Sequence, residues 1–258
     1  MSFVSRHYPK GSFNAHWFSL CNALSFQIIL GAPIILYAQS IGASSTVLGI
    51  LASFTPLMTV LQLPAAQFLG RFGYKRFVLM GWSLRTIFIF LVTLVPLASF
   101  LDGTSKLAII LASLFVFNLL RGISSAAWMP WIAALIPEEI RGRFISLDQI
   151  FMHLGSLLAL VASAFVMTGR VDPWEYSLVF LISAIGATLS LGFIRKIPEV
   201  EASETVRNSS EPVPWRQIIA YPPFRELLRF NVIFMAVIGS MGVFTVEYLR
   251  EFPRFDVS

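Results

Sequence analysis

One arginine lies in the middle of a long apolar segment, where a charged side chain is costly. Arg121 falls within the apolar run 107–133, and an arginine at the centre of a spanning helix costs about 2.5–3.5 kcal/mol on insertion scales. In a helix, Asn118, Arg121, Ser125 and Trp128 share one face, because they succeed one another at spacings of three or four residues. This polar stripe predicts a cavity-facing surface on which Arg121 presents a fixed positive charge to an anionic or polar solute. A structural arginine bonded to backbone carbonyls is the alternative.

Other polar side chains inside apolar runs could line the same cavity. Two are amides of the first run, and one is a histidine of the fifth run, which could titrate near neutral pH. A single histidine in a membrane is also commonly a hydrogen-bonded packing residue. The predicted substrate-binding set is Arg121, Asn118, Ser125, Trp128, Asn22, Gln27 and His153.

Two further charges fall within apolar runs. Arg85 lies about two turns into the third run, and we expect its long stem to extend toward the lipid phosphates. Asp148 is the one acid expected inside a span. We expect it to pair with Arg85 or with loop cations, rather than to carry a proton.

The sequence lacks the residue patterns of enzymes and metalloproteins. It has three histidines and one cysteine, with no HExxH, no glycine-rich phosphate loop and no paired carboxylates within the runs. Cys21 cannot form an internal disulfide or a cysteine metal cluster, and we expect it to pack inside the first run. These features predict no enzyme, no metal and no cofactor.

The elements that hold these residues must lie in lipid. Between Gly11 and Gly70 there is no charged residue, and the whole chain of 258 residues is 56% hydrophobic and 13% charged. Soluble domains are typically about 25% charged. The lipid bilayer is therefore the main expected partner. Nucleic acid is not, because the cations lie in short loops between apolar runs.

Seven apolar runs are long enough to span a bilayer as helices. They cover 15–38, 46–69, 77–100, 107–133, 145–168, 174–194 and 228–248. Continuous apolar runs without alternation disfavour a β-barrel, so we predict an all-α integral membrane protein. The prolines in or near these runs are expected to act as tolerated kinks.

The cations predict the orientation. Thirteen of the 19 lysines and arginines lie on the cytosolic side if the N-terminus is cytoplasmic, and four lie outside. Basic loops favour the cytoplasm, so we expect a multi-pass protein of the inner or plasma membrane with a cytoplasmic N-terminus.

The runs define three parts. Residues 1–195 form a predicted six-helix bundle, 196–226 a polar cytosolic linker, and 227–258 a seventh spanning helix. The linker ends in an aromatic and basic segment that suits either a position at the membrane surface or a loop. We expect the seventh helix to open a second bundle whose remainder is missing.

The turn after the second run is basic and carries two glycines. It reads GRFGYKR from Gly70 to Arg76, and Gly73 supplies a residue free to adopt positive φ. An ordinary hairpin with cytosolic cations would have the same composition.

This turn also resembles the loop between helices two and three of the Major Facilitator Superfamily, whose pattern is Gly-x-Leu-x-Asp-Arg-x-Gly-Arg-Lys. Arg71, Gly73 and Lys75 match the pattern, and Arg76 adds a cation. Gly70 occupies the position of the family's aspartate, so the charge latch that this carboxylate forms in the family lacks its acid here.

The loop after the fourth run strengthens the resemblance. It reads IPEEIRGR from Ile136 to Arg143 and is similar to the equivalent loop of the superfamily, although acids at a helix N-terminus would also suit a plain interfacial helix. The predicted gating-loop residues are Arg71, Gly73, Lys75, Arg76, Arg141 and Arg143.

The resemblance implies a secondary transporter, or the N-terminal portion of one, that moves a small solute by alternating access between two bundles. It implies a second helical bundle as partner, either a missing C-terminal half or another subunit, and leaves a coupling ion open. The alternative is a seven-helix receptor or another non-transporting membrane protein. A receptor would have the reverse orientation, and the seventh run has no lysine for a retinal linkage.

Overall fold

The computed structural model describes residues 8–168, 171–200, 215–230 and 233–234, and every regular element in these ranges is helical. Six stretches among them are long and apolar enough to cross a membrane. They are Asn14–Ser40, Ser45–Phe72, Tyr74–Leu97, Gly103–Leu135, Glu138–Val166 and Pro173–Lys196. These stretches match the first six predicted runs, and the predicted all-α membrane fold is confirmed. Most of the predicted seventh span, 228–248, lies outside the described residues.

Several spans consist of more than one helical piece. The first contains α1 (Asn14–Ile29) and α2 (Ala32–Ser40), and the second contains α3 (Ser45–Thr59), α4 (Gln62–Ala66) and α5 (Leu69–Phe72). The third contains α6 (Tyr74–Leu94) and the 3-10 turn η2 (Val95–Leu97), and the fourth contains α7 (Gly103–Ser124), η3 (Ser125–Ala127) and α8 (Trp128–Leu135). The fifth and sixth are the single helices α9 (Glu138–Val166) and α10 (Pro173–Lys196).

The interruptions lie close to prolines, as the sequence predicted. Pro33 stands in the first turn of α2, Pro64 lies in the short α4, and Pro96 lies in η2. Each of these positions suits proline, because the first residues of a helix have no intrahelical partner for their N–H groups. Pro56 and Pro130 remain inside α3 and α8, as neighbouring groups in a membrane bundle allow.

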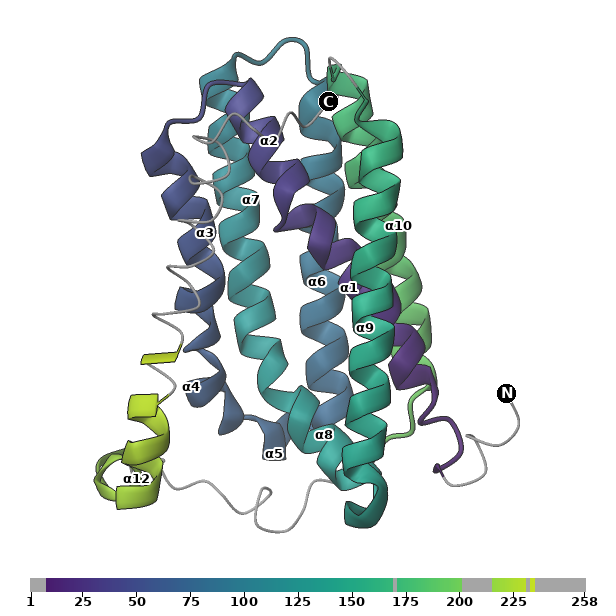
Figure 1. Ribbon diagram of the computed structural model, residues 1–258, viewed down its shortest axis with the longest axis vertical. Helices are drawn as coiled ribbons and strands as arrows, with labels where there is room; N and C mark the ends of the chain where they lie inside the picture. Colours follow the sequence, from purple (N-terminus) through teal and green to yellow (C-terminus); the bar gives the residue numbers. More distant parts are fainter. Residues whose placement is uncertain (1–7, 169–170, 201–214, 231–232, 235–258) are drawn as a thin grey trace, which may run out of the picture. The chain divides into compact units, whose positions relative to one another are not determined.

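The order of neighbouring helices in the bundle is α3, α7, α6, α10, α1 and α9. Figure 1 shows these long helices lying side by side, with α1 crossing the bundle obliquely. The spans at the two ends of this order, which contain α3 and α9, are the least buried. In each of them 11% of the apolar stretch is buried inside the protein, against 39–50% in the other four spans. One side of the bundle, between α3 and α9, is therefore less covered than the rest.

Small residues bring α9 close to α1. Gly155, Ala159 and Ser163 are the buried positions of α9 beyond its first turns, and they recur every four residues. A Cβ atom at Gly155 would overlap the carbonyl oxygen of Leu20 in α1. Membrane helices associate through this kind of close backbone packing, because lipid provides no hydrophobic drive between helices.

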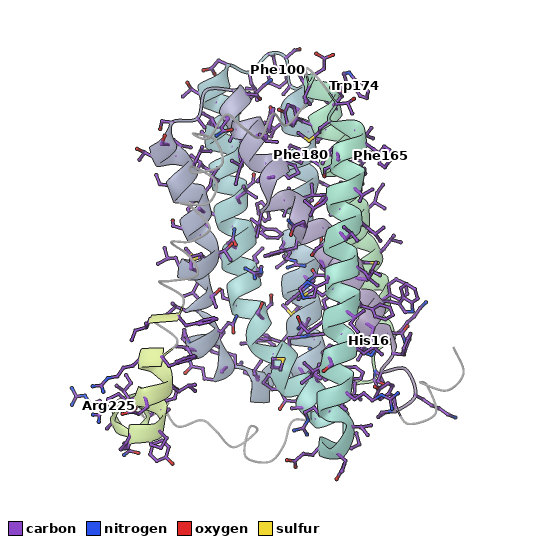
Figure 2. The ribbon with its side chains drawn as sticks, in the orientation of Figure 1. His16, Phe100, Phe165, Trp174, Phe180 and Arg225 are labelled. Carbon is purple, nitrogen blue, oxygen red and sulfur yellow. The ribbon has the colours of Figure 1, made fainter. Side chains whose placement is uncertain are left out.

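Large apolar side chains outside the buried core suit a lipid environment. Phe165 and Trp174 are 81% and 56% exposed, whereas Phe180 is fully buried. Figure 2 shows side chains along the whole outer surface of the helices, with Phe165 and Trp174 among them. Cys21 is buried in α1, as predicted for a packing residue.

Residues 211–258 form a second compact unit. Its described part contains α12 (Trp215–Ala220) and helical residues 222–230. The end of the predicted linker, 196–226, is thus helical rather than a loop. The proposed domain 227–258 lies mainly outside the described residues.

Candidate functional site

A cavity of about 630 Å³ lies inside the six-helix unit. Volumes of this order accommodate small-molecule ligands in proteins. Its wall comes from α1, α4, α6, α7, η3, α8 and α9. The polar and ionisable side chains on the wall are Ser19, Asn22, Gln27, Gln62, Arg85, Arg121, Ser125, Asp148, Gln149, His153 and Ser156. Aromatic side chains complete it: Phe18, Phe26, Trp82, Trp128 and Phe144.

The structure brings together six of the seven side chains of the predicted substrate-binding set. These are Arg121, Ser125, Trp128, Asn22, Gln27 and His153. They come from three separate spans, so their meeting depends on the helix packing and not on their spacing in the sequence. His153 lies with Gln149 and Ser156 on the α9 side of the cavity.

Asn118 does not reach the cavity. Its side chain is 1% exposed and accepts a hydrogen bond from Thr55 Oγ1 at 3.0 Å, while its amide nitrogen donates to the carbonyl of Leu114 at 2.8 Å. The residue therefore connects α7 to α3. The predicted stripe placed Asn118 beside Arg121, but one face of a helix is wide enough for neighbouring positions to meet different partners.

The fourth span tightens where Arg121, Ser125 and Trp128 meet. Helix α7 ends at Ser124, and Ser125 begins the 3-10 turn that leads into α8. Ser125 Oγ donates to the carbonyl of Arg121 at 2.7 Å. This turn keeps Arg121, Ser125 and Trp128 on one wall although they belong to three helical pieces.

The guanidinium of Arg121 makes no ion pair or side-chain hydrogen bond with the residues that the structure describes. It lies 4.5 Å from the ring centroid of Phe26, a distance that suits a cation–π contact. The carbonyl bonds that a structural arginine would make are not among these contacts. The charge is left facing the cavity.

Arg85 corrects a sequence expectation. Instead of extending toward lipid phosphates, it is 2% exposed and donates from Nη2 to Asn22 Oδ1. Its Cζ atom lies 4.4 Å from the Trp82 ring centroid and 5.3 Å from that of Phe117. Arg85 lies 11 residues beyond the first residue of α6, or about 16 Å along a helix. That depth places the group too far inside the bundle for its stem to reach a phosphate layer.

Asp148 also has a partner that the sequence did not indicate. Its Oδ1 atom lies 3.2 Å from Nδ1 of His16, and His16 is fully buried. The rings of Phe144 and Phe151 enclose the imidazole, at centroid distances of 4.3 and 5.4 Å. The expected pairing of Asp148 with Arg85 or with loop cations is therefore wrong. Figure 2 shows His16 toward the end of the bundle where α1 begins.

The sequence contained a signal for His16. His16, Ser19 and Asn22 follow one another at intervals of three residues in the first run. This spacing places them on one helix face, and Ser19 and Asn22 both line the cavity. The histidine stands at the very start of the run 15–38, where a polar residue is also typical of a helix end.

The basic loops lie at the same end of the bundle as the start of α1 (Figure 1). Gly73 separates α5 from α6 with φ +73°, as predicted for this turn. Arg141, near the start of α9, donates to the carbonyl of Ala133 at 2.9 Å and to that of Ile136 at 3.2 and 3.3 Å. These carbonyls belong to the C-terminal end of α8, where backbone acceptors lack intrahelical donors.

Removing the Arg141 side chain should destabilise the junction of α8 and α9. Hydrogen bonds from a charged donor contribute about 1.5–3 kcal/mol, and Arg141 is partly exposed. We therefore expect Arg141→Ala to cost about 1.5 kcal/mol, which lowers Tm by about 3–6 °C. Thermal unfolding in detergent measures the shift. Arg143→Ala, an exposed neighbour on α9, is the matched control and should move Tm by less than about 1 °C.

Comparisons with known proteins agree with this architecture. The family profile described as Major Facilitator Superfamily matches residues 17–255. A curated protein of Bacillus subtilis (strain 168), "Putative metabolite transport protein YyaJ", is 28% identical over 161 residues, which are 56% of this chain and 32% of that protein. The crystal structure of a D-xylose-proton symporter superimposes with a TM-score of 0.55 at 18% identity, covering 90% of this chain and 55% of the symporter. The chain thus spans at most about half the length of these two proteins.

Proposed function

We propose that this chain, which belongs to the Major Facilitator Superfamily, moves a small polar or anionic solute by alternating access. The family membership and the fold show a multi-pass membrane protein, and the family membership supports a secondary transporter rather than an enzyme. The proposal adds the class of solute and the mechanism. In this mechanism a central site opens alternately to the two sides of the membrane.

The observation that carries the proposal is Arg121 on the wall of the cavity. A cation without an ion-pair partner, at the depth of the bundle interior, is expensive unless it serves binding or transport. Among the described residues it faces a polar, aromatic-lined space large enough for a metabolite. We assign Arg121 to the charge of the solute, and Ser125, Trp128, Asn22, Gln27 and His153 to its polar and apolar parts. Asn118 we assign to helix packing.

The basic loops would gate access from one side. Arg71, Lys75 and Arg76 flank the Gly73 turn, and Arg141 and Arg143 begin α9. We propose that this side is cytoplasmic, with the N-terminus, because basic loops favour the cytoplasm. A fusion reporter at the N-terminus tests the orientation. Activity of the reporter outside the cell would contradict it.

We also propose that a second helical bundle covers the side between α3 and α9. These two spans are the least buried of the six, and polar side chains of α9 such as His153 and Gln149 are exposed there. Lipid is a poor solvent for such groups. The second bundle could be a further part of the protein or another subunit. The proposal leaves room for a coupling ion, but it assigns no residues to bind that ion.

Solute exchange across a membrane tests transport against the alternative of a receptor. Vesicles containing the protein are loaded with unlabelled solute and diluted into the same solute in labelled form, with inorganic phosphate, succinate and D-xylose as probes. A transporter accumulates label transiently without an energy source. If a probe binds the protein but no probe exchanges, the transport proposal fails and the receptor alternative gains support.

A further inference from the structure

We infer that Arg85 and Arg121 together form the binding site for an oxyanion, a carboxylate or a phosphate group, carried by the transported solute. The inference rests on the proposed function and specifies its solute. It adds Arg85, which we had expected to extend toward the lipid phosphates. The site consists of two guanidinium groups on neighbouring helices, α6 and α7.

Arg85 is buried without a counter-ion in the part of the chain that the structure describes. Among the described residues its guanidinium donates to one acceptor, the neutral amide oxygen of Asn22, and its Nε atom has no hydrogen-bond partner. A buried cation normally has a carboxylate partner, because removing the charge from water is costly. Two aromatic rings contact this guanidinium, and they hold it in place without neutralising its charge. The protein thus maintains a desolvated positive charge on the cavity wall.

The second cation makes the imbalance larger. Arg121 lines the same cavity as Arg85, and it has no acidic partner among the described residues. Like charges that share a site of low dielectric constant repel each other. One anionic group placed between the two guanidiniums would relieve both costs, and planar guanidiniums match the oxygens of carboxylates and phosphates well.

The one carboxylate on the described cavity wall does not supply this charge. Asp148 is on α9, and its Oδ1 atom contacts His16 at 3.2 Å. It has no ion pair with Arg85 or Arg121 among the described residues. Within the described ranges, the cavity therefore carries two cations without an ion pair and one acid that already contacts His16.

The rest of the wall indicates an organic anion. Next to the two arginines lie the rings of Phe26, Trp82 and Trp128. With about 630 Å³ available, the cavity has room for an acidic group together with a carbon skeleton. The structure assigns the acidic group to the arginines and the skeleton to these rings.

Calorimetry on the protein purified in detergent tests the inference by measuring anion binding. The probes are inorganic phosphate, succinate and neutral D-xylose. We expect phosphate or succinate to bind and Arg85→Gln to weaken that binding by at least about 30-fold. The variant should not lose thermal stability, because it removes an uncompensated buried charge. Lys106→Gln, which removes a cation from the first turn of α7 outside the cavity wall, should bind as the unmodified protein does. Phosphate and succinate as separate probes distinguish a phosphate ligand from a carboxylate ligand.

A second variant keeps the test decisive if Arg85→Gln does not fold. Asn22→Asp places a carboxylate against Arg85 and supplies an internal counter-ion. We expect it to weaken anion binding by at least about 30-fold while leaving Tm unchanged or higher. If both variants bind anions like the unmodified protein, or if D-xylose alone binds, the oxyanion site is wrong.

The two proposals fail separately. Exchange of D-xylose in vesicles, unaffected by Arg85→Gln, would contradict the oxyanion site and leave the transporter intact. Anion binding that depends on Arg85, without any exchange, would support the site and contradict transport.

Discussion

Replacing Arg121 with glutamine should reduce exchange of the transported solute by about 30- to 700-fold at low solute concentration. The change removes the charge of a group that faces the cavity. Losing one partner of a desolvated charge pair costs about 2–4 kcal/mol, and each 1.4 kcal/mol corresponds to a factor of ten in affinity. Initial exchange rates in vesicles, measured over a range of solute concentrations, give the loss. We expect most of this loss to result from a higher half-saturation concentration for the solute.

Two controls separate binding from folding. Arg121→Lys retains the charge and should recover part of the loss, although its ammonium cannot bind an oxyanion in the planar way that a guanidinium does. Lys106→Gln changes the net charge equally at a site outside the cavity and should leave exchange unaffected. Unchanged exchange in a folded Arg121→Gln protein would mean that the solute does not contact this residue.

Replacing Gly155 with leucine should give the largest loss of stability. A Cβ atom at this position would overlap the carbonyl oxygen of Leu20, which belongs to the backbone of α1. A backbone atom cannot rotate away as a side chain could, so α9 must move away from α1. Overpacking of this kind costs about 3 kcal/mol, which lowers Tm by about 6–12 °C. Thermal unfolding in detergent, followed by circular dichroism, measures the change.

Gly142 is a matched control on the same helix. Apart from the surrounding backbone of α9, no atom of the described residues lies within 4 Å of a Cβ placed there. Gly142→Leu should leave Tm unchanged or raise it slightly, because leucine favours helix more than glycine does. Equal Tm values for the two variants would contradict the close approach of α9 to α1.

The membrane fold could be predicted from the sequence because lipid imposes a simple rule on it. Spanning helices need long apolar runs, and the charge-free stretch from Gly11 to Gly70 satisfies that rule without any knowledge of packing. The first six predicted runs are helical in the structure. The positive φ of Gly73 also followed from local chemistry. What the sequence did not contain was the order of neighbours, since apolar residues on every side of a helix do not indicate which helix it packs against.

The site was less predictable because it depends on that order. Asn118 lies only three residues before Arg121, yet it bonds to Thr55 of α3 and is absent from the cavity wall. Arg85 and His16 acquired their importance from partners in other spans, Asn22 and Asp148. Helical spacing shows which residues share a face, but it does not show what that face meets. Polar residues at depth were a reliable guide to the region, and their individual partners were not.

Protection of a cysteine at Ser125 by solute is the most direct test of the central claim that the cavity is the solute route. Cys21 is the single cysteine of the chain, so Ser125→Cys in a Cys21→Ser background carries one reactive thiol, on the cavity wall beside Arg121. A membrane-impermeant thiol reagent is applied from each side of the membrane, with and without the transported solute. We predict that the thiol is labelled from both sides in turn and that the solute slows the labelling. A thiol that reacts from neither side, or at a rate that the solute does not change, would contradict the claim.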